Sequence, residues 1–83
     1  MFDELYVNGV VVNLKSYDDM VEFSKLADSH GYRFRSESRY SELLVYDYGE
    51  NTCYEVSCGM YCDIDYFTNK EPKKIVVYKS NNR

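Results

Sequence analysis

Proline, histidine and tryptophan are nearly missing from this chain of 83 residues, which has one proline, one histidine and no tryptophan. A long apolar run is missing too. Crossing a bilayer as a helix takes about 20 consecutive apolar residues, so no membrane partner is expected. The first four residues, MFDE, end in two acids, whereas a secretory signal begins with basic residues. The sequence therefore predicts a cytoplasmic location.

The scarcity of histidine also limits metal and catalytic chemistry. Three cysteines, Cys53, Cys58 and Cys62, have the spacing C-x4-C-x3-C, whereas a structural zinc site needs four ligands, usually in C-x2-C pairs. His30 lies far upstream beside a glycine, where a helix is expected to end. We expect no metal and no cofactor. Cys58 and Cys62 fit small half-buried apolar residues, or a pair that faces across a hairpin turn and forms a disulfide under oxidation.

No recognisable catalytic motif is present either. The glycines are isolated and lack the spacing of a phosphate-binding loop. Asp63 and Asp65 share one face of an expected strand, as a nuclease carboxylate pair does, but a strand edge that favours solubility has the same pattern. The sequence predicts a protein that is not an enzyme.

Length and composition predict one small folded domain over residues 1–83. The chain is 45% hydrophobic and 17% aromatic, far from the low hydrophobicity of disordered segments. A chain of this size is near the lower range at which a single core folds without disulfides or metals.

The first half of the chain predicts a β-hairpin followed by a helix. Asn8-Gly9 lies between two apolar runs, and this dipeptide favours the tight turn of a hairpin over residues 4–14. Ser16 is a typical N-cap residue, and apolar residues then recur at helical spacing. Gly31 is a typical residue after a helix C-terminus. A helix is therefore expected over residues 17–30.

The second half predicts an antiparallel β-meander of four to five strands packed on that helix, which gives an α+β fold. Tyr32 and Phe34 alternate with arginines as in a strand. Further strands are expected over residues 43–48, 52–58, 60–66 and 73–79, with a turn at Gly59. One helix cannot cover both faces of such a sheet, so the other face is expected to meet water, a second subunit or a partner.

Residues 40–69 combine tyrosine with acid: they include six tyrosines and six carboxylates but no Lys or Arg. Tyrosine is enriched at protein interfaces, although it is also simply a good strand former. We therefore predict a protein-binding surface, for a protein partner or a homodimer, on the uncovered sheet face. Its predicted residues are Tyr46, Tyr48, Tyr54, Glu55, Tyr61, Asp63 and Asp65.

An alternative site comes from the most basic part of the chain's first half. Arg33, Arg35, Arg39 and Tyr40, with interleaved aromatics, form a mixture that stacks on and neutralises a single-stranded nucleic acid or a nucleotide ligand. The net charge of −4 opposes this reading, because phosphate binding needs clustered basic residues. Among so many carboxylates, the three arginines fit better as intramolecular or intersubunit salt-bridge partners.

In size, composition and layout the chain resembles small proteins encoded by bacteriophages. The features that carry this resemblance are the short predicted hairpin, the helix that ends in HGYRF over residues 30–34, and the tyrosine-rich meander. The resemblance implies a protein that acts by binding, for instance as an inhibitor of a host defence nuclease, a toxin or a transcription factor. The acid excess is too modest, and the C-terminal segment too basic, for a DNA mimic.

Overall fold

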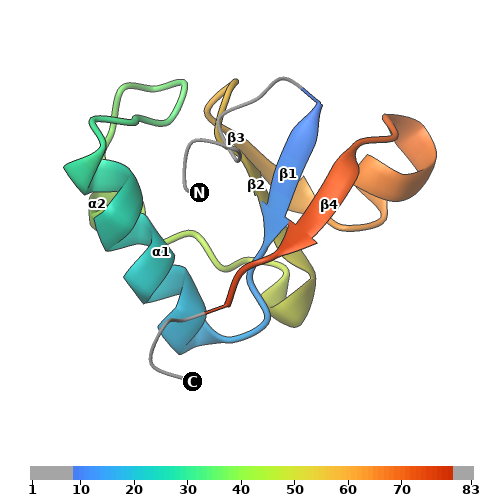
Figure 1. Ribbon diagram of the computed structural model, residues 1–83, viewed down its shortest axis with the longest axis horizontal. Helices are drawn as coiled ribbons and strands as arrows, with labels where there is room; N and C mark the ends of the chain where they lie inside the picture. The colour runs from blue at the N-terminus through green and yellow to red at the C-terminus, as the bar shows by residue number, and fades with distance from the viewer. Residues whose placement is uncertain (1–8, 80–83) are drawn as a thin grey trace.

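The computed structural model describes residues 9–79 and has an α+β fold in which helices pack beside a four-stranded mixed sheet (Figure 1). No helix in this part of the chain has the length and apolarity needed to cross a membrane. The helices are α1 (Tyr17–Ser29) and α2 (Tyr40–Leu43), with a 3-10 turn η2 (Gly49–Asn51) and a π-helical turn η3 (Tyr66–Lys70). The strands are β1 (Val10–Asn13), β2 (Thr52–Glu55), β3 (Met60–Asp63) and β4 (Lys74–Val77).

Helix α1 forms where the sequence predicts it. The Ser16 hydroxyl accepts a hydrogen bond from the Asp19 N–H at 3.1 Å and so caps the N-terminus. The helix ends before Gly31, which has a positive φ of 80°. Its buried face meets the sheet through Met20, Phe23 and Ala27.

Two of the expected strands are wrong, because the chain between α1 and β2 forms turns and the short helix α2 instead. The side chain of Asp28 accepts hydrogen bonds from the Tyr40 N–H, at 2.9 Å, and from the Ser41 hydroxyl, which fixes the start of α2 against α1. Leu44 then adopts a left-handed conformation with φ of 44°. No strand forms over residues 32–35 or 43–48.

The sheet has the order β3-β2-β1-β4, and it is mixed. β1 pairs antiparallel with β2, and β2 with β3, but β4 runs parallel to β1, with Val10 beside Lys74. The expectation of a purely antiparallel meander is therefore wrong for β4. Gly59 turns the chain between β2 and β3, as predicted. The second strand of the predicted N-terminal hairpin is β1, while its first strand lies outside the described residues.

Each face of the sheet carries its own apolar cluster. On the α1 side, Val12 of β1 and Tyr54 of β2 pack with Phe23 and with the loop that carries Phe34. On the other side, Phe67 of η3 packs against Val11 and Cys53. The expectation of an uncovered second face is therefore wrong in part, because η3 covers it around Phe67.

Candidate functional site

Tyr54 and Tyr40, expected on binding surfaces, are fully buried. Tyr54 lies on the central strand β2, where its ring contacts Phe23, Phe34 and Tyr40, and its hydroxyl donates to the Val45 carbonyl. Burial raises the pKa of the Tyr54 hydroxyl well above its usual value of 10. Both tyrosines belong to the core, so placing them on a binding surface is wrong.

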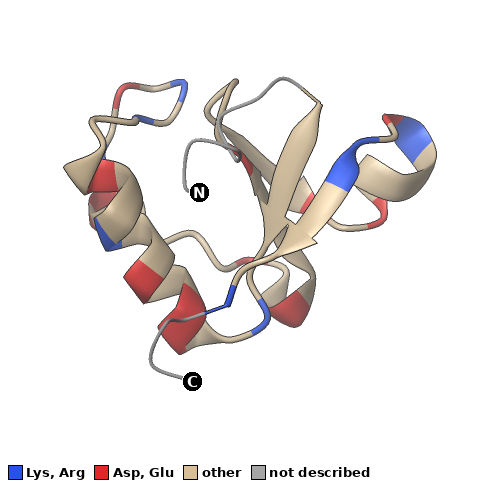
Figure 2. Cartoon of the chain, in the orientation of Figure 1, with Lys and Arg blue, Asp and Glu red and all other residues tan. Residues whose placement is uncertain are grey.

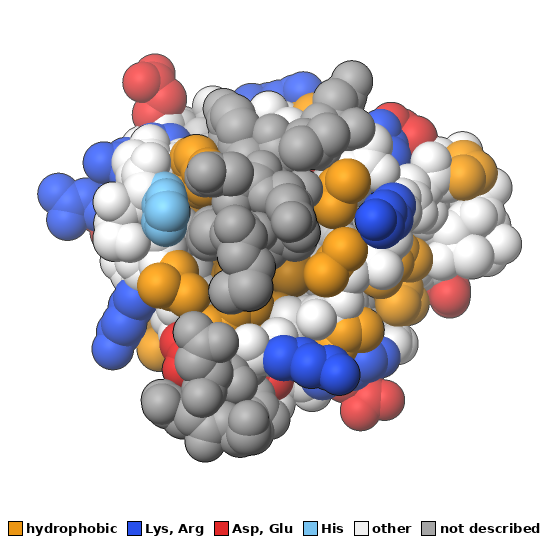
Figure 3. Space-filling view, in the orientation of Figure 1, with side chains coloured by type: hydrophobic (Ala, Val, Ile, Leu, Met, Phe, Trp, Pro, Cys, Tyr) orange, Lys and Arg blue, Asp and Glu red, His pale blue; other side chains and the backbone are white. Residues whose placement is uncertain are grey.

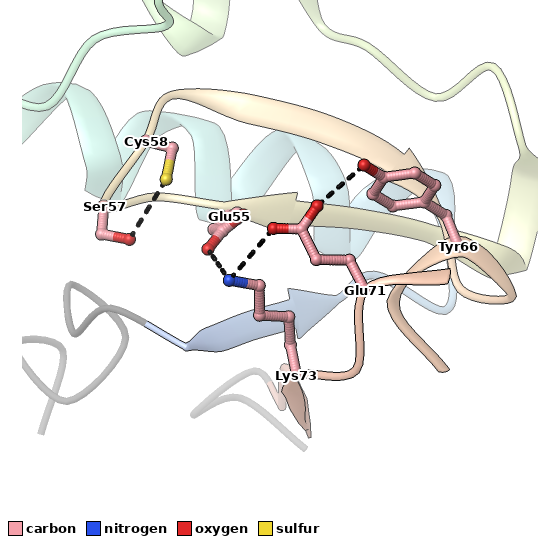
Figure 4. Close-up of polar contacts among 6 residues, drawn as sticks. All are labelled: Glu55, Ser57, Cys58, Tyr66, Glu71 and Lys73. Carbon is pink, nitrogen blue, oxygen red and sulfur yellow. Dashed lines mark hydrogen bonds and ion pairs between the residues drawn. The ribbon is translucent and has the colours of Figure 1, made fainter. Parts of the chain in front are cut away.

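Glu55 is also buried instead of exposed, and Figure 4 shows why this is tolerated. Its carboxylate pairs with the Lys73 ammonium group at 3.2 Å. Lys73 also reaches Glu71 at 3.4 Å, and Glu71 accepts a hydrogen bond from the Tyr66 hydroxyl. Glu55 therefore joins β2 to the segment before β4, and it contributes no side chain to the surface.

Three of the predicted surface residues do come together beside β3. Tyr61 and Asp63 belong to β3, and Tyr48 lies near both. Interaction with Cys62, partial burial and Asp47 raise the pKa of the Tyr48 hydroxyl, in that order.

Of the two remaining predicted surface residues, Asp65 lies beside Asp63, whereas Tyr46 packs toward α1. Tyr46 is half-buried and contacts the ring of Tyr17 edge-on. Asp65 is exposed, and its N–H donates to the Asp63 carboxylate at 2.6 Å. Both aspartates line a shallow depression of about 290 Å³ with Tyr66, Asn69 and Lys70.

A second, larger depression runs beside the start of β3, and we call it the β3 groove. It has a volume of about 390 Å³. Its lining consists of Phe34, Arg35, Ser36, Leu43, Gly59, Met60 and Tyr61. The sequence prediction missed Leu43 and Met60, because a lone leucine or methionine carries no signal of exposure until neighbouring segments are placed.

The three arginines of the alternative site are exposed in the loop between α1 and α2 (Figure 2). Two of the interleaved aromatics are not available for stacking, because Phe34 and Tyr40 are buried against each other with ring centroids 4.0 Å apart. On the face seen in Figure 3, Lys and Arg side chains are separated instead of gathered in one patch. On this face the arrangement lacks the continuous basic surface that single-stranded nucleic acids need.

No arginine forms an ion pair within residues 9–79. The predicted intramolecular salt bridges of Arg33, Arg35 and Arg39 are therefore wrong for this part of the chain. Arg35 instead lines the β3 groove, where its side chain is exposed.

The cysteines are all free thiols. The sheet register places Cys62 opposite Cys53, and Cys58 lies in the turn before β3. No group of metal-ligating side chains occurs among the described residues. Cys53 and Cys62 belong to the apolar cluster around Phe67.

Cys53 is expected to resist thiol reagents in the folded protein. It is fully buried, and burial is the main cause that raises its pKa from 9.0 to about 11. At pH 8, titration with Ellman's reagent should modify Cys58 and Cys62 first and Cys53 only after denaturation, because the thiolate is the reactive form. Fast labelling of Cys53, read by peptide mass spectrometry, would contradict this placement.

Comparison of the chain with protein-family models, curated proteins and solved structures finds no match.

Proposed function

We propose that the chain is a non-enzymatic protein-binding module that uses the side chains around the β3 groove. The observation that carries this proposal is the gathering of exposed apolar residues there. Leu43, Tyr48 and Tyr61 are 47%, 41% and 39% exposed, and Leu43 and Tyr61 line the same groove. Exposed apolar groups that cluster in this way are typical of binding sites, and tyrosine loses little conformational entropy on binding.

The charges around the groove favour a partner with polar groups on either side of an apolar anchor. Arg35 lines the groove, whereas Asp63 lies at the other end of β3. An apolar side chain of the partner would enter between Leu43 and Tyr61. Complementary charges at the two ends would then fix its orientation, which is the usual contribution of charge at an interface.

The role that we propose for this binding is inhibition of a host protein in the host cytoplasm, as in the phage-encoded proteins that the chain resembles. A defence nuclease, a toxin and a transcription factor are the target classes. Inspection of the neighbouring genes tests the phage origin. Adding the purified chain to activity assays of the captured partner tests the inhibition.

Affinity capture tests the binding surface directly. The immobilised chain is incubated with host lysate, and retained proteins are identified by mass spectrometry. Replacing both Leu43 and Tyr61 with Ala should lower retention of the specific partner at least tenfold, which corresponds to about 1.4 kcal/mol. A few central aromatic and apolar anchors carry most of the energy of an interface, so this double variant removes the expected anchor.

The matched control is a Leu26→Ala, Val77→Ala double variant. Leu26 of α1 and Val77 of β4 have comparable exposure but do not line the groove, so retention should be unchanged. Circular dichroism establishes that both variants fold. Equal retention by the wild type and the Leu43→Ala, Tyr61→Ala variant would contradict the proposed surface.

A further inference from the structure

The outer edge of β3 is unpaired in the part of the chain that the structure describes. β3 stands at the end of the sheet order, with β2 on its inner side. An unpaired edge presents backbone N–H and C=O groups that pair readily with another strand. The directions of the individual groups follow from the hydrogen bonds of β2.

The backbone of Thr52 points away from β3. Its carbonyl accepts a hydrogen bond from the Leu14 N–H at 3.0 Å, on the β1 side. Successive residues of a strand point their backbone groups to opposite sides, so Cys53 points toward β3. Its cross-strand partner is Cys62. The N–H and C=O groups of Cys62 therefore point to β2 and bond to Cys53, as in a hydrogen-bonded antiparallel pair.

A second hydrogen bond gives the same alternation beyond the end of β3. The Ile64 N–H donates to the Asn51 carbonyl at 2.8 Å, so Ile64, like Cys62, points inward. Tyr61 precedes Cys62, and Asp63 lies between Cys62 and Ile64. Because the direction alternates along a strand, the backbone N–H and C=O groups of Tyr61 and Asp63 point to the outer edge. Each of the two offers one donor and one acceptor to a further strand.

Opposite charges stand at the two ends of this edge. At the start of β3, the Arg35 N–H donates to the Gly59 carbonyl at 2.9 Å, which holds Arg35 beside the turn. Just past the end of β3 lies the exposed Asp65. Neither side chain forms an ion pair within residues 9–79. A copy of this edge that runs antiparallel brings Arg35 toward the partner's Asp65.

We propose that the chain forms a homodimer in which β3 pairs antiparallel with the partner's β3 about a two-fold axis at Cys62. This inference goes beyond the proposed function, because it concerns the backbone edge of β3 and a second copy of the chain, whereas the host protein is proposed to contact the side chains of the β3 groove. Pairing Tyr61 with the partner's Asp63 uses every outward backbone group. A register that opposes Asp63 to the partner's Asp63 is disfavoured, because like charges directly opposite each other destabilise a sheet.

The proposed register aligns the remaining groups as well. The Arg35 N–H already occupies the outward position beside Gly59, so the paired segment ends at Tyr61 and the partner's Asp63. The partner's Asp65, two residues further along its chain, then comes close to Arg35 on both sides of the axis. Cys62 meets the partner's Cys62 at a position without hydrogen bonds, where Cα atoms are about 4.5 Å apart. Side chains above and below the edge, including the ring of Tyr61, remain available to line the β3 groove.

Sedimentation equilibrium tests the dimer across a hundredfold range of concentration at low salt. The apparent mass should rise from that of the 9.8 kDa monomer to twice that value. Arg35→Asp or Asp65→Arg alone should weaken dimerisation at least about tenfold through like-charge repulsion. The Arg35→Asp, Asp65→Arg double variant should restore it, because the exchanged charges attract again.

Arg33→Asp is the matched control, since it makes the same change of charge in the same loop, but the Arg33 side chain does not line the β3 groove and instead donates to the Tyr32 carbonyl. It should leave the dimer constant nearly unchanged. A monomer at every concentration overturns the proposal. So does an Arg33→Asp variant that weakens the dimer as much as Arg35→Asp, because general charge would then explain the effect.

Oxidation reports on the register itself. Diamide accepts two electrons and two protons as two thiols join into a disulfide, so a Cys62–Cys62 crosslink needs no other reactant. The crosslink should form in the Cys58→Ser variant and be absent in the Cys62→Ser variant, since disulfides require Cα separations of about 4.4 to 6.8 Å. A crosslink through Cys58 alone, or no crosslinked dimer, contradicts the proposed axis.

The two proposals fail separately. A strictly monomeric chain that still captures a host protein through Leu43 and Tyr61 overturns only the dimer. A dimer with the expected crosslink that captures nothing overturns only the host-binding function.

Discussion

Replacing Tyr54 with Ala is expected to lower the free energy of unfolding by about 3 to 5 kcal/mol, the usual cost of truncating a buried aromatic residue. Tyr54 is fully buried, and its ring contacts Phe23, Phe34 and Tyr40. No smaller side chain fills that volume. Urea denaturation monitored by circular dichroism measures the loss.

Tyr61→Ala is the matched control, because Tyr61 is the cross-strand partner of Tyr54. The two rings project from the same face of the sheet, but Tyr61 is 39% exposed on the edge strand. Its removal should cost less than half as much as the removal of Tyr54. Equal losses for the two variants would show that Tyr54 is not the better packed residue.

The same residue predicts a pH dependence. Burial raises the pKa of the Tyr54 hydroxyl above that of an unfolded tyrosine, near 10. Above pH 10 the unfolded chain loses this proton while the folded chain keeps it, so stability contributed by Tyr54 falls as the pH rises. Tyr54→Phe has no proton to lose, and its stability should decline less steeply between pH 9 and pH 11.

Gly59→Ala is expected to destabilise the protein by about 3 kcal/mol, for two separate reasons. Gly59 has a positive φ of 68°, a conformation that costs other residues about 1 to 2 kcal/mol. A Cβ atom there would also lie 2.5 Å from the Arg35 backbone nitrogen. Relief of that overlap requires the loop at Phe34 and Arg35 to move, and overpacking of this kind costs about 1 to 3 kcal/mol.

Gly49→Ala separates the two effects. Gly49 has a similar φ of 58°, but a Cβ atom there meets nothing within 4 Å. It should therefore show the conformational cost alone, about 1 to 2 kcal/mol. If the two alanine variants lose the same stability in urea denaturation, close contact between the turn and the loop does not contribute.

The sequence predicts those elements whose signals are local. Helix α1 has its N-cap at Ser16, its apolar periodicity and its terminal glycine within one segment, and it forms over nearly the predicted range. The turn at Gly59 follows from a similar local signal. In the helix and in the turn, the residues that give the sequence signal are close in the chain and also contact one another in the structure.

Residues 32–35 show why alternation alone is insufficient. Phe34 is buried between exposed arginines, as the pattern predicts, but this segment forms no strand. Its backbone instead bonds to Ser38 and Gly59. The parallel pairing of β4 was missed for a related reason, because no local feature tells a strand which edge of the sheet it will join.

Only part of the candidate site was predicted, because the position of a strand in the sheet also decides which side chains are exposed. Alternation correctly places Tyr54 and Tyr61 on faces of strands, but burial depends on the order of the strands in the sheet. β2 is a central strand and hides Tyr54, whereas β3 is an edge strand and leaves Tyr61 exposed. The burial of Glu55 could not be predicted without its ion pair with Lys73. Lys73 lies 18 residues later in the chain, and only the fold brings it to Glu55.

The parallel pairing of β1 with β4 has a consequence for how the protein is made. Val10 and Lys74 are neighbours in the sheet although 64 positions separate them in the chain. Contacts between such distant segments slow folding, because a long loop must close before the strands gain from pairing. During synthesis, β1 cannot pair with β4 until residues 74–77 have left the ribosome. Until then, the backbone groups on the β4 side of β1 are unpaired, and this edge can pair with another chain and aggregate.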